Sequence, residues 1–106
     1  MGLIDKLFGK KRDYAQEFKD AFLNGQPGKC ATIVSDWHKH TTHDANQDYA
    51  DAILGSVLAY QDKNKEFLEK AEYIFDNTNP NCENPSLTEW FKTAAKVSIM
   101  KARTEM

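Results

Sequence analysis

The sequence is poor in the features that usually reveal a function. It has only 2 cysteines, Cys30 and Cys82, and its early apolar stretch is too short and too charged for a secretory signal. We therefore expect reduced thiols and a cytoplasmic location. A strong excess of basic residues is also lacking. The 14 lysines and arginines stand against 16 acidic residues, which argues against a general nucleic-acid binder.

The polar residues form no recognisable catalytic set, and the composition is neither that of a disordered chain nor that of a membrane-spanning one. Hydrophobic residues make up 41% and charged residues 28% of the 106 residues, as in ordinary globular proteins. A chain of this length has room for one domain and buries roughly 65% of its unfolded surface. The sequence therefore predicts a core that needs no disulfide or metal, and it implies no cofactor.

What the sequence does have is helical periodicity. Apolar residues recur at spacings of three, four and seven in several segments that caps and breakers separate. This pattern predicts an all-α fold, a single compact domain of about five helices in antiparallel hairpins, arranged as a bundle or a tetratricopeptide-like stack. We expect helices over about residues 13–24, 29–39, 44–60 and 65–75, and a last helix after an asparagine-rich loop over 76–85.

Capping residues mark where several of these helices should begin. Asp13 precedes the first, and Thr42 or Asp44 precedes the third, in positions suited to accept a hydrogen bond from a free backbone amide. The segment Ser86-Leu87-Thr88-Glu89 matches the capping box. It predicts that Ser86 is the N-cap of the last helix.

Residues 1–12 differ in charge from the helical domain that we expect over 13–106. Ile4, Leu7 and Phe8 share one side of a possible short helix, and a run of Lys10, Lys11 and Arg12 follows. One interpretation is that the apolar side chains pack on the domain's core. The alternative is weak contact of residues 2–12 with an anionic membrane surface.

Residues 49–80 resemble a tetratricopeptide-type helical hairpin. Leu54-Gly55 in the first helix, Ala71 in the second and Pro80 after it fall within about one position of the pattern of this family. No second copy at the family's period is visible. The resemblance implies a right-handed stack of antiparallel helices with a concave surface for a peptide or protein partner.

All three histidines lie close together, which makes this segment the candidate metal site. His38 and His40 point about 200° apart on a helix, so they do not bind one ion together there. His40 with His43 or Asp44 is better spaced, and Asp48 offers a further oxygen. The alternative is that these are solvated polar residues at a helix end.

Cys30 allows two interpretations as well. Its place near a predicted helix start would lower its pKa, but it also begins the apolar spacing that continues through Ile33 and Trp37. We expect a small buried hydrophobe.

The leading functional hypothesis is a protein-interaction surface. Carboxylates share one side of the third predicted helix and form a candidate face for a basic partner, although acidic residues in a first turn are also favoured by the helix dipole. Large aromatics are candidate anchors for a partner or, equally, core residues. The candidate partner-binding residues are Asp44, Asp48, Asp51, Trp37, Tyr60 and Trp90.

The sequence therefore predicts a small cytoplasmic helical interaction module without catalytic activity, an adaptor or an inhibitor of the kind that neutralises a toxin or enzyme. Its protein partner and its oligomeric state are not indicated. Two alternatives stay open. One is a metal-binding protein or enzyme that uses His40, His43 and Asp44, and the other is a peripheral membrane protein that uses residues 2–12.

Overall fold

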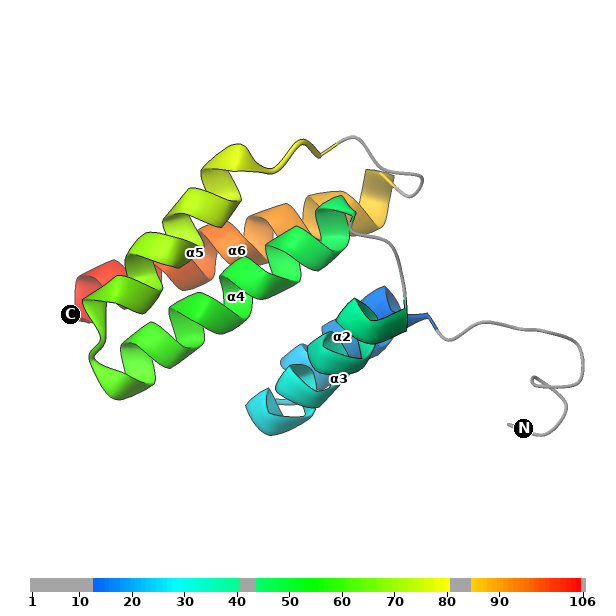
Figure 1. Cartoon of the computed structure of the whole chain (residues 1–106), viewed down its shortest axis with the longest axis horizontal. Coiled ribbons are helices and arrows are strands. Elements are labelled where there is room, and N and C mark those ends of the chain that lie inside the picture. Colours follow the sequence, from blue (N-terminus) through cyan, green and yellow to red (C-terminus); the bar gives the residue numbers. More distant parts are fainter. Residues whose placement is uncertain (1–12, 41–43, 81–84, 106) are drawn as a thin grey trace, which may run out of the picture.

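The computed structural model describes residues 13–40, 44–80 and 85–105, and within these ranges it contains five helices and no strand. The predicted all-α fold with about five helices is therefore confirmed (Figure 1). None of the described helices is both long and apolar enough to cross a membrane. The helices are α2 (Tyr14–Leu23), α3 (Pro27–His40), α4 (Ala45–Asp62), α5 (Lys65–Asn77) and α6 (Pro85–Glu105).

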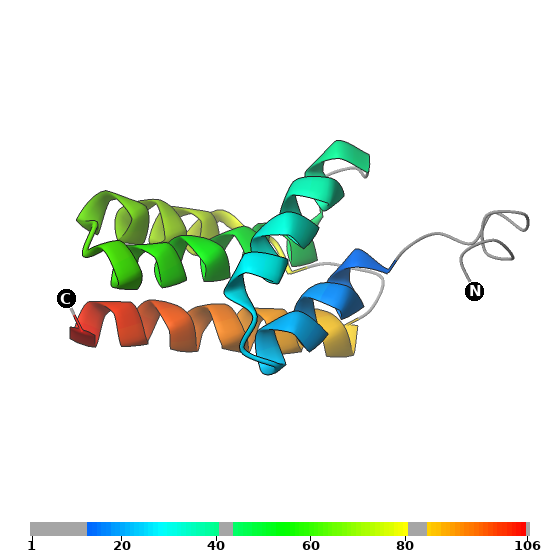
Figure 2. The same ribbon diagram turned by 90° about the horizontal axis from the view of Figure 1, so that it is seen from below.

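The three C-terminal helices form one unit and the two N-terminal helices form a hairpin against it. Helix α5 runs antiparallel to α4, and α6 returns in the direction of α4 (Figures 1 and 2). The C-terminal ends of α4 and α6 meet where Lys63 Nζ donates to the Glu105 carbonyl oxygen at 3.3 Å. The α2–α3 hairpin lies beside the N-terminal halves of α4 and α6 and leaves their C-terminal halves extending beyond it (Figure 2).

Local sequence explains where most of these helices begin and end. The side chain of Asp13 accepts a hydrogen bond from the Gln16 amide at 3.1 Å, and Asp44 accepts one from the Gln47 amide at 2.9 Å. The predicted N-cap Asp13 is thus confirmed, and of the two candidates for the third helix, Thr42 and Asp44, it is Asp44 that caps α4. Lys63 ends α4 in the left-handed backbone region, with φ 53°, which turns the chain sharply into α5.

Two predicted helix starts were wrong. Helix α3 begins at Pro27 and not near Lys29, and α6 begins at Pro85, so Ser86 lies inside the first turn and is not the N-cap. The reason is the same in both helices. The fixed φ of proline suits the first helical position, where its missing N–H would have had no partner within the helix.

The core is built from stacked and crossed aromatic rings that join the hairpin to α6. Phe18 of α2 and Phe91 of α6 are fully buried, with ring centroids 5.5 Å apart. Trp37 of α3 stacks on Tyr14 at 6.2 Å and meets Phe91 edge-on at the same distance. Burial of each of these rings stabilises the fold by about 2–3 kcal/mol, so the hairpin is held firmly on the N-terminal half of α6.

Helices α4 and α5 approach closely at Gly55, one of the residues that carry the tetratricopeptide resemblance. A Cβ atom on Gly55 would lie 3.3 Å from the Cβ of Ala71, tighter than an ordinary contact. The predicted antiparallel hairpin over these two helices is present. Small residues at 55 and 71 allow its helices to pack at short distance.

Candidate interaction surface

The candidate metal ligands do not come together in the described part of the chain. His40 is the exposed last residue of α3, and Asp44 is occupied in capping α4. His43 lies outside the described residues. Among residues 13–40, 44–80 and 85–105, no group of three or more histidine, cysteine, aspartate or glutamate side chains is placed to hold a metal ion.

The three carboxylates of the predicted acidic face all have contacts within the molecule. Asp44 caps α4, and both carboxylate oxygens of Asp51 contact His38 Nε2, at 2.9 and 3.0 Å. The third carboxylate, Asp48, also interacts within the fold. Burial raises the pKa of the neighbouring Tyr49, and the negative charges of Glu89 and Asp48 raise it further. The His38–Asp51 contact joins α3 to α4 and was not predicted, because the two residues lie on different helices with no local pattern to pair them.

The three candidate aromatic anchors differ in how much surface they offer. Trp37 is only 3% exposed and lies in the core. Trp90 is half-buried, with its ring edge-on to Phe22 and the Lys19 ammonium 5.3 Å from its centroid. Tyr60 is half-buried near the C-terminal end of α4. Trp90 and Tyr60 are therefore the candidate anchors that keep part of their surface exposed, and Tyr60 also lines a cavity.

Cys30 behaves as the predicted buried hydrophobe. It is 1% exposed, and its Sγ lies 3.9 Å from the Phe18 carbonyl oxygen. Burial raises the pKa of the Cys30 thiol, even though the residue is in the first turn of α3. This environment opposes formation of the reactive thiolate at neutral pH.

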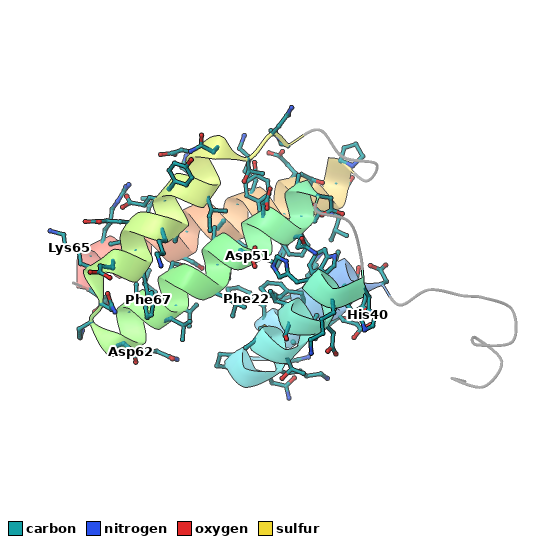
Figure 3. All side chains as sticks on the ribbon, in the orientation of Figure 1. Phe22, His40, Asp51, Asp62, Lys65 and Phe67 are labelled. Carbon is teal, nitrogen blue, oxygen red and sulfur yellow. The ribbon has the colours of Figure 1, made fainter. Side chains whose placement is uncertain are left out.

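Two adjoining cavities form a groove along α4, which we call the α4–α6 groove. The first has a volume of about 180 Å³ and lies between α4 and the α2–α3 turn. The second, of about 260 Å³, lies between α4 and α6. Phe22 and Val57 line both cavities, and Figure 3 shows Phe22 between α4 and the hairpin. The remaining lining residues are Gly25, Gln26, Pro27, Cys30, Ile53, Leu54, Ser56, Tyr60, Gln61, Ser98, Lys101 and Ala102.

The groove exists because the α2–α3 hairpin is shorter than the helices it covers. It packs on the first turns of α4 and α6, while α5 covers the opposite side of their C-terminal halves (Figures 1 and 2). The groove side of these halves is left without a helix on it. Exposed apolar side chains border it. Leu58 lies one helical turn after Leu54 and is 44% exposed, and Val97 lies one turn before Lys101 and is 59% exposed.

Two lysine side chains lie at the edge of this mainly apolar groove. Lys101 is the one charged side chain among the described residues that line the two cavities. Its ammonium lies 5.3 Å from the centre of the Tyr60 ring, and the Lys63 ammonium lies at the same distance from that ring. Two cations therefore share one aromatic ring at the edge of the groove.

The groove was not predicted from the sequence as a site, although one of its residues was. Tyr60 stood out as a large aromatic near a helix end, whereas Phe22 and Val57 follow the same apolar spacing as core residues. Comparison of the chain with family models, with curated proteins and with solved structures finds no match.

Proposed function

We propose that this chain is a non-catalytic interaction module that binds a protein partner in the α4–α6 groove. The open groove between α4 and α6 is the observation that carries the proposal, because apolar residues of α4 line it and no helix of the described structure covers them. A partner would complete the packing that the short hairpin leaves unfinished. A cytoplasmic location is part of the proposal, and Cys30, a free and buried thiol, is compatible with it.

The lining of the groove suits a protein partner. Phe22, Leu54 and Val57 offer apolar surface, and Tyr60 adds an aromatic side chain with a polar tip. Such an arrangement is typical of sites where a few apolar side chains of a partner become buried within a more polar rim. The acidic residues of α4 are less suited to this role, because Asp44 and Asp51 already have partners within the fold.

Site-specific photo-crosslinking in the natural host tests this function. Gln61 lines the groove and is exposed, so we would replace it with p-benzoylphenylalanine. Glu69, exposed on α5, is the matched control position. We expect a discrete adduct with one other protein from position 61 and none from position 69. Absence of an adduct at position 61, or equal adducts at both positions, would contradict binding in the groove.

A further inference from the structure

The charges around the groove indicate which chemistry the partner carries. We infer that the α4–α6 groove binds an amphipathic helix whose apolar stripe is flanked by carboxylates. This inference rests on the proposed function and specifies the partner. Its basis is the pair of unneutralised ammonium groups of Lys63 and Lys101 beside an apolar groove.

These two ammonium groups have no carboxylate partner in the described structure. Lys101 forms no ion pair with a described residue, and its ammonium contacts the Tyr60 ring alone. Lys63 donates to a backbone carbonyl oxygen, that of Glu105. Lys63 is the C-cap of α4, where the helix dipole favours a cation, and Lys101 lies about one turn before the end of α6. A partner's carboxylate would meet two positive charges that are already positioned.

A helix is the shape that this groove accommodates. The described residues contain no strand, so no sheet edge is present to pair with an extended peptide. The walls of the groove are helices, and its open part continues the surface that α2 occupies on the first half of α6. An added helix would therefore pack as α2 does, with side chains three and four positions apart facing Phe22, Leu54 and Val57.

The charge pattern also distinguishes the chain's own N-terminal segment from an external partner. Residues 2–12 are amphipathic but basic, with Lys10, Lys11 and Arg12 at their end. Their basic side chains offer no charge opposite to that of Lys63 and Lys101. The carboxylates of an acidic partner would instead be attracted to the ammonium groups of Lys63 and Lys101.

The test uses three synthetic helical peptides and the isotope-labelled full chain. Each peptide has about 18 residues, because shorter isolated helices are marginally stable, with leucines along one stripe. The residues that flank the stripe are glutamate, glutamine or lysine. In NMR titrations we expect the glutamate peptide to shift amide signals of 53–61 and 97–102, and to bind about fivefold more tightly than the glutamine peptide.

Charge reversal provides the decisive variant. Lys101→Glu, at an exposed position, leaves one ammonium group, that of Lys63, beside one carboxylate, so the glutamate peptide should lose its advantage over the other two peptides. Lys70→Glu on the exposed surface of α5 is the matched control and should leave the original order unchanged. Equal binding of the three peptides, no binding of the glutamate peptide, or shifts confined to residues 66–74 would each overturn the inference.

Two other occupants have their own signatures. Shifts of the groove amides on deletion of residues 2–12 would show that the chain's own N-terminal segment occupies the groove. Concentration-dependent shifts of the same amides would show a second copy of the chain. Either result would overturn the acidic-helix inference.

The crosslinking experiment distinguishes this inference from the proposed function. An adduct at position 61 whose partner segment lacks carboxylates would overturn this inference alone. The absence of any adduct there would overturn the proposed function.

Discussion

At the scale of single residues, Cys30 shows two opposing electrostatic effects. The N-terminal end of α3 favours a thiolate, but burial among apolar side chains disfavours it. Burial is the larger effect, because the pKa of the Cys30 thiol is raised above its ordinary value of 9.0. The residue therefore acts as a packing group that fills space beside Phe18, and its hydrogen bond to the Phe18 carbonyl is long and weak.

The raised pKa of Cys30 predicts a loss of stability in alkali. A thiol whose pKa is higher in the folded state stabilises the fold fully below the unfolded-state pKa, near 9.0, and loses this contribution as pH rises through the folded-state pKa. We expect the free energy of unfolding to fall more steeply between about pH 7 and pH 10 in the wild type than in Cys30→Ala. Urea unfolding at each pH measures this free energy for both proteins.

Tyr49 is the matched comparison for this experiment. Its pKa is also raised above the ordinary 10.0, so some alkaline loss should persist in Cys30→Ala and decrease further in the double variant with Tyr49→Phe. Identical pH profiles for the wild type and Cys30→Ala would contradict the burial argument.

At the scale of the helix, Asp44 shows how an acidic residue serves the fold. Its side chain accepts the Gln47 amide at 2.9 Å, one of the donors left free at the start of α4. The same residue had been a candidate metal ligand and a candidate partner contact. Occupation of its Oδ1 by the helix makes the capping role the one that the described contacts support.

Replacement of Asp44 separates capping from charge. We expect Asp44→Ala to lower the free energy of unfolding by about 1 kcal/mol, because the free amide loses its acceptor. Asp44→Asn keeps an acceptor oxygen and loses only the charge, so it should retain most of the stability. Denaturant midpoints of the three proteins provide the measurement. If Asp44→Asn were as unstable as Asp44→Ala, the charge and not the cap would be responsible.

The His38–Asp51 contact connects two helices but contributes little to stability. The side chains are 42% and 23% exposed, and exposed ion pairs contribute about 0.2–1 kcal/mol. Its role is to orient the end of α3 against α4. The aromatic rings beneath it hold the hairpin in place.

At the scale of the whole molecule, two apolar clusters share the same long helices. The larger joins α2 and α3 to the N-terminal halves of α4 and α6, and the smaller joins α5 to their C-terminal halves. Because α4 and α6 take part in both clusters, unfolding one half removes support from the other. This arrangement favours a single cooperative transition.

Cooperativity can be measured with the two tryptophans. Trp37 and Trp90 both lie where the hairpin meets the other helices, so their fluorescence reports on hairpin docking, whereas far-ultraviolet circular dichroism reports on all helices. We expect the two signals to change at the same urea concentration. Phe91→Ala should shift both midpoints together, with a loss of about 3–5 kcal/mol. A fluorescence transition that precedes the dichroism transition would show that the hairpin unfolds independently.

The sequence by itself determined the fold class, the approximate helix ranges and the cap at Asp13, and it restricted the cap of α4 to Thr42 or Asp44. These features depend on residues three to seven positions apart, so periodicity and side-chain chemistry within one turn or two are sufficient. The burial of Cys30 and Trp37 follows from the same periodicity. The error at Ser86 is also local, since the fixed φ of Pro85 suited the first helical position and moved the helix start forward.

Only the tertiary structure decided which surface stays open. The α4–α6 groove depends on where the short hairpin ends on the longer helices, and no local pattern in the sequence encodes that position. The approach of Lys63 and Lys101 to one tyrosine ring joins residues of different helices, as does the contact of His38 with Asp51. Such contacts arise from packing angles and helix lengths, which the chain sets only when its apolar faces assemble.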